Sequence, residues 1–316
     1  MSSDRRTRSL RVAFLGNDAW SVPSLEALAE SPHEVVTVVT AAPKPAGRGS
    51  ELRPTPVADA ARSLGLEPAE VDTIRTGPGF RRLAGSLPDV LVVVAYGELL
   101  PPTILHLPTI APINLHFSLL PALRGASPVQ TALLLGLERT GVTTIVMDPG
   151  LDTGPIVLQR EEPVLPDDDA GSLGARLAAA GALVLADTVG MLAAGPIAPR
   201  PQDGALATYA PKLGPDDRIL DWAEPARLLV NLCRALSPDP AATTTFRGER
   251  LKVFRAEAVE ATGEPGRIVA VGREGIVVAT AEGGFRPVDV APAGRKRMSG
   301  ADLVNGLRPE VGERLG

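Results

Sequence analysis

Cysteine, histidine and aromatic residues are scarce in this 316-residue sequence, and each scarcity excludes a class of structure. The single cysteine, Cys233, excludes an intrachain disulfide and a cysteine-rich metal site. Cys233 lies in an apolar helical pattern, so we expect a small buried side chain there. The three histidines, His33, His106 and His116, are too few and too scattered for a typical metal centre, and we expect no metal. Aromatic residues make up only 3%, so the cores must consist mainly of Ala, Val, Leu and Ile.

Two phosphate-binding motifs are also missing. Gly16 ends the first apolar run, but no G-x-G-x-x-G pattern follows it, which argues against a nicotinamide or flavin enzyme. No G-x-x-x-x-G-K-[ST] pattern occurs, which argues against a nucleoside triphosphatase.

Nothing in the sequence indicates export or membrane insertion. The polar N-terminus has no apolar signal core, and no run elsewhere is expected to reach membrane-spanning length. We therefore expect a cytoplasmic protein with no membrane partner.

Apolar runs and helical patterns alternate along the first two thirds of the chain. The runs at Leu10–Gly16, Glu34–Thr40, Asp89–Ala95, Ile113–His116 and Val142–Met147 predict strands. The segments Pro23–Leu28, Pro56–Leu64, Pro128–Leu135 and Leu173–Leu192 predict helices. This alternation predicts an α/β fold with an open, mostly parallel sheet, whose ligands bind beyond the carboxyl ends of the strands. Gly16, Tyr96, His116 and the turn at 150–154 all belong at that edge.

The last third has a different pattern. The Pro-rich segment Gly195–Gly204 reads as an interdomain linker, and Pro225–Leu236 predicts a helix. Short strands are then expected at Leu251–Val253, Ile268–Val271, Ile276–Ala279 and Phe285–Val290, a spacing typical of a small barrel or sandwich. We expect one domain over 1–204, a linker at about 195–213, and a second domain over 214–316.

Asn114, His116 and a nearby Asp form the strongest candidate for a site of chemistry. Asn114 and His116 are two residues apart, so an extended backbone directs both side chains to one side. An amide can polarise a carbonyl, an imidazole can move a proton, and a carboxylate can orient the imidazole. Asp152, between Gly150 and Gly154, and Asp148 compete for the last role, and sequence spacing does not choose between them.

Basic residues form three clusters in a chain whose net charge is −5. Residues 1–212 carry 17 Lys and Arg against 22 Asp and Glu, whereas residues 213–316 carry 15 of each. One cluster lies in the Pro/Gly-rich segment Thr40–Pro54, which reads as a long loop. The others contain Arg247, Arg250, Lys252 and Arg255, and then Arg295, Lys296 and Arg297. Each alone is typical of solvated charge, but together they favour a phosphate-backbone partner.

Several motifs resemble the methionyl-tRNA formyltransferase family. They include the runs Asn114–Pro121, Arg124–Gln130 and Met147–Gly154, with Pro45–Gly49, Val94–Gly97, Tyr209–Leu213, Ile219–Trp222 and Pro292–Lys296. The resemblance covers nearly the whole chain. It implies a Rossmann-like formyltransferase domain followed by a small OB-like β-barrel domain. It also implies transfer of a formyl group from 10-formyltetrahydrofolate to the α-amino group of methionyl-initiator-tRNA, for the initiation of translation.

The resemblance assigns roles residue by residue. It makes Asn114, His116 and Asp152, in preference to Asp148, the catalytic residues. Folate is expected along Val94, Ala95, Tyr96 and Gly97, and along Ser118, Leu119, Leu120 and Pro121. tRNA is expected at Lys44, Arg48, Arg53, Arg250, Lys252, Arg295, Lys296 and Arg297.

Three other functions fit these residues less well. A formyltransferase for a nucleotide-linked amino sugar would keep the catalytic trio but would not need the basic segment or the C-terminal barrel. Glycinamide ribonucleotide formyltransferases stop near the end of the first domain, so they fit the length poorly. A tRNA-binding protein without catalysis would not need Asn114, His116 and Asp152.

Overall fold

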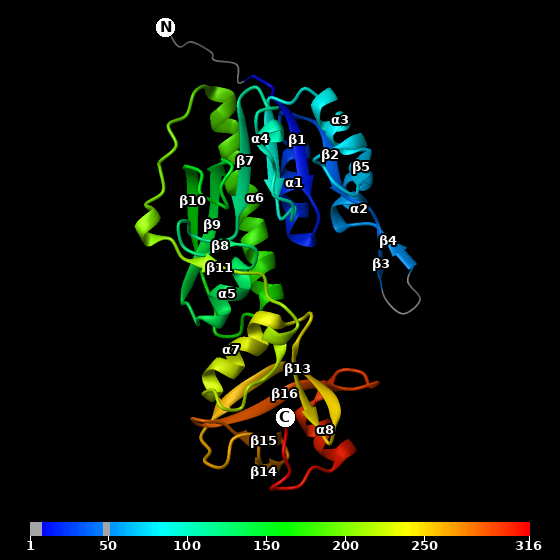
Figure 1. Ribbon diagram of the computed structural model, residues 1–316, viewed down its shortest axis with the longest axis vertical. Helices are drawn as coiled ribbons and strands as arrows, with labels where there is room; N and C mark the ends of the chain where they lie inside the picture. The colour runs from blue at the N-terminus through cyan, green and yellow to red at the C-terminus, as the bar shows by residue number, and fades with distance from the viewer. Residues whose placement is uncertain (1–7, 47–50) are drawn as a thin grey trace. The chain divides into compact units, whose positions relative to one another are not determined.

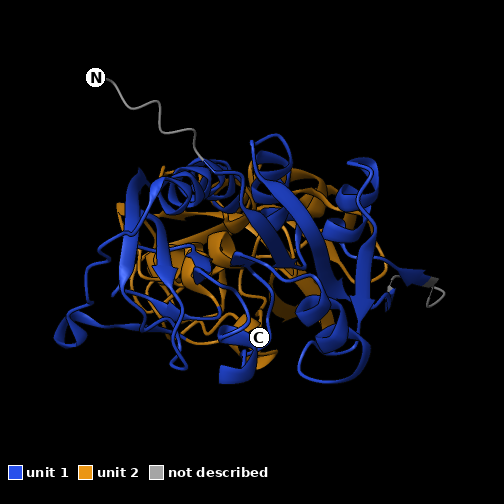
Figure 2. Cartoon of the chain, turned by 90° about the horizontal axis from the view of Figure 1, so that it is seen from above, with its two compact units in different colours: residues 1–126, 140–163, 174–210 blue, residues 127–139, 164–173, 211–316 orange. Residues whose placement is uncertain are grey.

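The computed structural model describes residues 8–46 and 51–316, and the chain divides into two compact units. Unit 1 contains residues 1–126, 140–163 and 174–210, and unit 2 contains residues 127–139, 164–173 and 211–316 (Figure 2). Each unit has its own sheet and its own buried core.

A seven-stranded sheet in the order β10-β9-β7-β6-β1-β2-β5 forms the centre of unit 1 (Figure 1). Its strands are β1 Arg11–Gly16, β2 Glu34–Ala41, β5 Pro68–Val71, β6 Val90–Val94, β7 Ala111–His116, β9 Arg139–Val146 and β10 Ile156–Pro163. The pairs β7–β6, β6–β1, β1–β2 and β2–β5 are parallel, whereas β7 and β9 are antiparallel. The expected mostly parallel sheet is confirmed.

The residues of β1 after Arg11 and all residues of β6 are buried on both faces, as expected for central parallel strands. Ala13 and Leu15 face one core cluster, which contains Leu83 of α3 and Ile104 of α4. On another part of the sheet, Gly181 of α6 lies directly against Leu115. The helices and short elements of this region are η1 Ala19–Ser21, α1 Val22–Ala29, α2 Pro56–Ser63, α3 Gly77–Gly85, α4 Pro102–Leu105, β8 Arg124–Gly125, α6 Ala170–Ala194, η2 Gly204–Leu206 and β11 Tyr209–Ala210.

The expectation that no run reaches membrane-spanning length is wrong for α6. This 25-residue helix is long and apolar enough to span a membrane by length and composition. Two of its glycines pack closely within unit 1, because Gly174 lies against the Trp20 ring and Gly181 against Leu115. These close approaches make α6 a core helix of the sheet layer.

Unit 2 is built around an antiparallel sheet in the order β12-β13-β16-β15-β14, with β17 paired to β16. Its elements are α5 Pro128–Leu134, η3 Asp216–Arg218, α7 Ala226–Leu236, β12 Ala242–Phe246, β13 Glu249–Val259, β14 Ile268–Gly272, β15 Gly275–Ala279, β16 Gly284–Pro292, β17 Met298–Ser299 and α8 Gly300–Leu307. Strands β12 and β17 were not predicted from the sequence, and only three of the eleven residues of β13 were expected to be in a strand.

The C-terminal residues join the two edges of this sheet. Leu315 forms a bridge with Phe246 in β12, and Arg314 forms one with Arg267, directly before β14. The amide of Ile268 also donates to the Glu313 carbonyl at 2.8 Å. The open edges are thereby paired, which closes the sheet as a small barrel.

Replacing Leu315 by Ala should lower the free energy of unfolding of unit 2 by about 2–5 kcal/mol, because the side chain is 1% exposed in the core. Val311→Ala is the matched control, since Val311 is 65% exposed and should change stability by about 0.5 kcal/mol or less. Urea unfolding followed by tryptophan fluorescence measures both. Equal losses in the two variants would mean that the C-terminal segment does not stabilise the barrel.

Candidate active site

The structure brings the three candidate catalytic residues together at the carboxyl end of β7. Asn114 Nδ2 donates to Asp152 Oδ1 at 3.3 Å, and His116 Nδ1 lies 3.7 Å from the same oxygen. The His116 and Asp152 side chains are 6% and 13% exposed. One carboxylate oxygen therefore faces both the amide and the imidazole in a largely water-excluded place, where electrostatic interactions are stronger than in bulk water.

Asp148 serves a different purpose from Asp152. Its Oδ1 accepts hydrogen bonds from the Gly150 amide at 3.0 Å and from Thr153 Oγ1 at 2.6 Å. These are the local bonds of a turn-forming aspartate. The geometry thus separates two residues that spacing alone could not separate: Asp148 shapes the turn, and Asp152 contacts Asn114 and His116.

A backbone carbonyl fixes the hydrogen on the His116 ring. Nε2 lies 2.9 Å from the Leu123 carbonyl oxygen, which can only accept a hydrogen bond. Nε2 therefore carries a hydrogen, and Nδ1, which faces Asp152, is the ring atom left to exchange a proton.

Asp152 itself is held in an unusual backbone conformation. Its φ is +55°, in the left-handed region, and Leu123 beside the His116 ring has φ +59°. Non-glycine residues in this region cost on the order of 1–3 kcal/mol each and persist where the surroundings fix them. Part of that fixing comes from the Gly125 amide, which donates to Asp152 Oδ2 at 2.9 Å.

The two segments expected to bind folate follow neighbouring parallel strands. Val94 at the end of β6 pairs with Leu115 near the end of β7, so residues 94–97 and 118–121 begin at the same sheet edge. Thr143 Oγ1 donates to the Ser118 carbonyl at 2.6 Å, and Gln159 Nε2 donates to the Leu120 carbonyl at 2.7 Å. Their role in folate binding stays a prediction.

Tyr96 lies in the first of these segments. Burial raises the pKa of its phenol, and the nearby Glu98 acts in the same direction. Tyr96 is 5% exposed and keeps its hydroxyl hydrogen at neutral pH. The Asn17 side chain donates to the Tyr96 carbonyl, which ties the segment to the end of β1.

Two glutamines that were not predicted as site residues contact this region. Gln159 binds the second of the two segments expected to bind folate, and Gln202 binds the turn that carries Asp152. Neither follows a periodic pattern, and Gln202 falls in the segment expected to be a linker. Residues 200–210 are instead paired within unit 1: Arg200 forms a bridge with Ile156, and Tyr209 pairs with Arg124.

The basic segment near residue 44 is a hairpin and not the expected loop. β3 (Lys44–Ala46) and β4 (Glu51–Arg53) are antiparallel, and Lys44 lies opposite Arg53. Both cations are exposed, and cross-strand partners lie on one face of a hairpin. Arg48, the third predicted tRNA contact here, lies outside the described residues.

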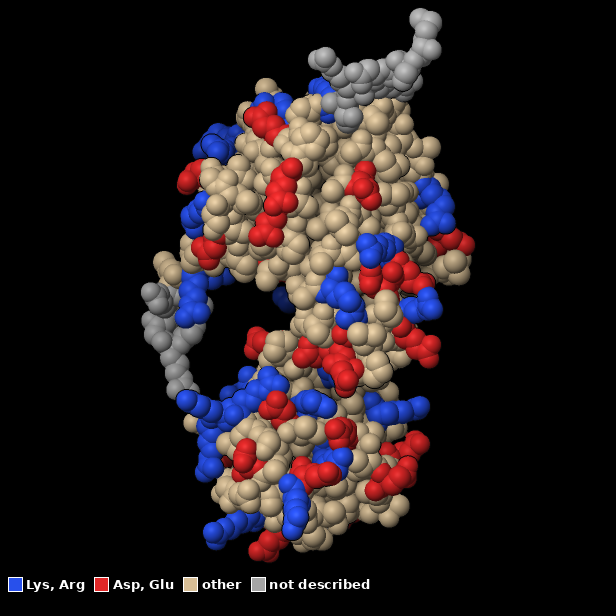
Figure 3. Space-filling view, turned by 180° about the vertical axis from the view of Figure 1, so that it is seen from behind, with Lys and Arg blue, Asp and Glu red and all other residues tan. Residues whose placement is uncertain are grey.

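The predicted basic residues of unit 2 lie on and beside the outer face of β13. Arg250 and Lys252 alternate with the buried Leu251 and Val253, so their side chains leave the barrel on the same side. Arg297 reaches this face from the β16–β17 turn, because its guanidinium lies 4.4 Å from the centre of the Phe254 ring. Lys and Arg side chains gather along one part of this unit in Figure 3.

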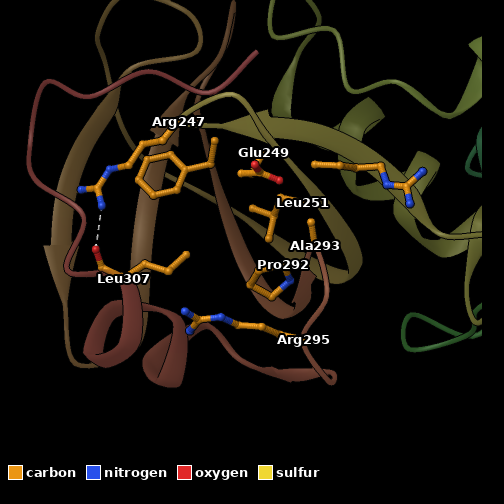
Figure 4. Close-up of a pocket in the computed structure, with 9 residues that line it drawn as sticks. Arg247, Glu249, Leu251, Pro292, Ala293, Arg295 and Leu307 are labelled. Carbon is orange, nitrogen blue, oxygen red and sulfur yellow. Dashed lines mark hydrogen bonds between the residues drawn. The ribbon is translucent and has the colours of Figure 1, made fainter.

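Arg297 and Arg295 differ in their surroundings. Arg297 is bound to Asp289, with Nε 2.7 Å from Oδ2, and this hydrogen bond raises the pKa of Arg297. Arg295 lines a cavity of about 250 Å³ together with Arg250 and Leu251 (Figure 4). On the other side of that cavity Arg247 donates to the Leu307 carbonyl at 2.9 Å. Lys296 is exposed in the same turn.

The site contains no candidate metal centre in the part of the chain that the structure describes. Among residues 8–46 and 51–316, no three His, Cys, Asp or Glu side chains are grouped so that they could hold a metal ion. The donor set of amide, imidazole and carboxylate suits proton transfer and carbonyl polarisation.

Comparison with known proteins gives matches over both units. The family model described as formyl transferase matches residues 10–189, and the model described as formyl transferase, C-terminal domain, matches residues 212–308. A methionyl-tRNA formyltransferase of Acidithiobacillus ferrooxidans is 41% identical over 98% of this chain and 100% of its own length. One of Geobacter sulfurreducens is 41% identical over 97% of each chain.

Solved structures share the fold at low sequence identity. HypX from Aquifex aeolicus, in complex with tetrahydrofolic acid, is 18% identical and gives a TM-score of 0.66 over 97% of this chain and 49% of its own. An N-formyltransferase from Helicobacter canadensis, with folinic acid and dTDP-3-aminofucose, is 13% identical and gives 0.64 over 92% of this chain and 100% of its own.

Adding a methyl group at Gly154 should displace the turn that carries Asp152. A Cβ there would collide with the Val146 carbonyl oxygen, a backbone atom of β9 that cannot rotate away. We expect Gly154→Ala to lower the free energy of unfolding by about 1–3 kcal/mol or more. Gly190→Ala in α6 is the control: nothing lies near its Cβ, and it should stabilise the helix by about 0.5–1 kcal/mol. If Gly154→Ala unfolded in urea with the same free energy as the native protein, the close approach of Gly154 to the Val146 carbonyl would be contradicted.

Proposed function

Because the chain belongs to the formyl transferase family, we propose that it transfers the formyl group of 10-formyltetrahydrofolate to the α-amino group of methionyl-initiator-tRNA. The observation that carries the proposal is the match of methionyl-tRNA formyltransferases at 41% identity over 97–98% of this chain and 97–100% of their own length. The cluster of Asn114, His116 and Asp152 supplies groups that suit this reaction. We further propose that residues 1–204 form the catalytic domain, that residues 214–316 bind tRNA, and that the protein acts in the cytoplasm.

The amine must be neutral to attack the formyl carbon. A free α-amino group has a pKa of about 7.7–8.0, and the neighbouring ester lowers it further, so deprotonation near neutral pH costs little. The amine nitrogen forms a bond to the formyl carbon, and the carbonyl electron pair moves to the formyl oxygen. When the bond from that carbon to the folate nitrogen breaks, the oxygen returns its electron pair and the folate nitrogen takes up a proton.

Asn114 suits the stabilisation of the developing oxyanion. Its Nδ2 gives one hydrogen to Asp152, which orients the amide and leaves the second hydrogen for the formyl oxygen. Donors of this kind are worth about 2.7–4 kcal/mol each in the transition state.

His116 and Asp152 suit the transfer of the proton. With Nε2 bound to the Leu123 carbonyl, His116 takes part through Nδ1, on the side of Asp152. Asp152 orients the ring and, through it or through a bound water, passes the amine proton to the folate nitrogen.

The direct test offers the protein 10-formyltetrahydrofolate with one acceptor at a time. We expect formylation of methionyl-initiator-tRNA and none of a nucleotide-linked amino sugar, measured as transfer of a radiolabelled formyl group. Formylation of the sugar without the tRNA would refute the proposal.

Substitutions in the trio should lower turnover with little change in stability. Asn114→Ala, His116→Ala and Asp152→Asn are each expected to reduce kcat by about 10²-fold or more. Asp148→Asn makes the same chemical change four residues from Asp152 and should be mild, because its bonds are those of the turn. Steady-state kinetics compares the four variants. If Asp148→Asn proved worse than Asp152→Asn, the assigned carboxylate would be wrong.

The salt dependence of tRNA binding tests the basic face of unit 2. Arg250→Gln combined with Lys296→Gln should reduce the slope of log affinity against log salt by roughly one unit for each phosphate that the variant no longer binds. Turnover at saturating tRNA should stay near the native value, since neither residue belongs to the trio. Arg273→Gln, exposed in the β14–β15 turn, is the control for removal of a positive charge. An unchanged slope in the double variant would show that Arg250 and Lys296 are solvated surface charges that bind no phosphate.

A further inference from the structure

We infer that Gln202 is a positioning residue that holds the Asp152 turn in its working conformation, and that Arg124 fixes the orientation of the Gln202 amide. The inference rests on the proposed function, because it assigns a part in that reaction to a residue outside the trio.

Gln202 uses both of its amide hydrogens on the turn. Nε2 donates to the Asp152 carbonyl at 2.8 Å and to the Gly154 carbonyl at 2.7 Å. These two carbonyls belong to the left-handed Asp152 itself and to the glycine two residues after it. A backbone conformation that most residues avoid needs such external bonds to persist, and here one side chain supplies two of them.

Arg124 determines which way the Gln202 amide points. The oxygen and nitrogen of an amide have nearly the same shape, so either end could face the turn. Arg124 is 6% exposed, and its Nε and Nη2 donate to Gln202 Oε1 at 3.1 and 2.7 Å. A guanidinium has donors only, so it binds the oxygen and leaves the NH₂ group for the carbonyls of the turn.

Three consecutive residues thereby hold two members of the candidate trio, His116 and Asp152. The Leu123 carbonyl binds the His116 ring, the Gly125 amide binds the Asp152 carboxylate, and Arg124 acts on the Asp152 backbone through Gln202. Since β8 contains Arg124 and Gly125, a shift of this strand would move imidazole and carboxylate together.

The segment that contains Gln202 also anchors β8. Thr208 Oγ1 accepts from the Leu123 amide at 2.9 Å, and the Thr208 carbonyl accepts from the Arg124 amide at 2.8 Å. Residues 202–208 therefore contact β8 through its backbone and through the Arg124 side chain. Gln202 is the member of this segment that reaches the turn.

Gln202→Glu separates the contact of residue 202 with the Asp152 turn from its contact with Arg124. A glutamate keeps an acceptor for Arg124 and adds an ionic attraction, so the anchor is retained. It replaces the donor to the turn by an oxygen that faces two carbonyl oxygens. We expect kcat to fall on the order of 10- to 100-fold, because small misplacements of catalytic groups have effects of this size. KM for 10-formyltetrahydrofolate and for charged tRNA should change less than about threefold, whereas the melting temperature should fall modestly, because two hydrogen bonds to the turn are lost.

Arg124→Lys provides a second variant that keeps the charge. Arginine donates two N–H groups in a fixed geometry, whereas lysine has a single flexible ammonium group, so lysine holds Gln202 Oε1 less firmly. The Arg124→Lys variant should therefore give a kcat between those of the native protein and Gln202→Glu. Asn305→Asp, an exposed amide-to-carboxylate change in α8, is the control and should leave kcat unchanged.

The kinetic pattern decides the inference. Native kcat in Gln202→Glu would overturn it, and so would a raised KM for tRNA at unchanged kcat, which would make Gln202 a substrate contact. Formyl transfer by the native chain is measured in the same series. If the native chain formylates no methionyl-tRNA, the proposed function fails, whereas an active native chain with an equally active Gln202→Glu variant refutes the positioning role alone.

Discussion

The hydrogen bond from the Gly125 amide to the Asp152 carboxylate is the contact on which the site depends. It joins β8, which follows β7, to the turn after β9, and it turns one carboxylate oxygen toward Asn114 and His116. A side chain at Gly125 would meet the Ala210 carbonyl at 2.6 Å, and its φ of +121° disfavours other residues. The glycine is therefore required by its backbone conformation and by its close pairing with β11, and its amide is the group that binds the carboxylate.

A different constraint organises unit 2. Trp222 packs edge-to-face on Phe285, with ring centroids 5.4 Å apart, and the backbones of Gly266 and Gly316 approach its indole. The C-terminal residues therefore pack against the core where Leu315 forms a β-bridge with Phe246 of β12. When the barrel closes, Leu251 and Val253 of β13 face its core, and Arg250 and Lys252 lie on its outer face. The barrel therefore determines which cations share a surface.

The spacing of apolar residues in the sequence predicted the strands and helices that are buried on one face or on both. The Val/Leu run of β6 and the alanine-rich α6 were expected within a few residues of their observed bounds. β10 was missed, because only Ile156 is buried in it and its later residues are charged. β3 and β4 were missed because proline and glycine suggested a loop, although Lys44 and Arg53 pair across a hairpin.

The sequence predicted the groups of the candidate site: an amide and an imidazole two residues apart on a strand, and a carboxylate in a glycine-bounded turn, within a family pattern over both units. Their part in catalysis stays a prediction. The family resemblance selected Asp152 over Asp148, but the contacts of Asp152 with Asn114 and His116, and what holds it there, follow only from the packing of the folded chain. Asp152 lies 38 residues from Asn114, and Gln202 a further 50 from Asp152. Contacts between residues so far apart in the sequence depend on how strands and turns pack in space. A single glutamine that makes such a contact leaves no periodic pattern in the sequence.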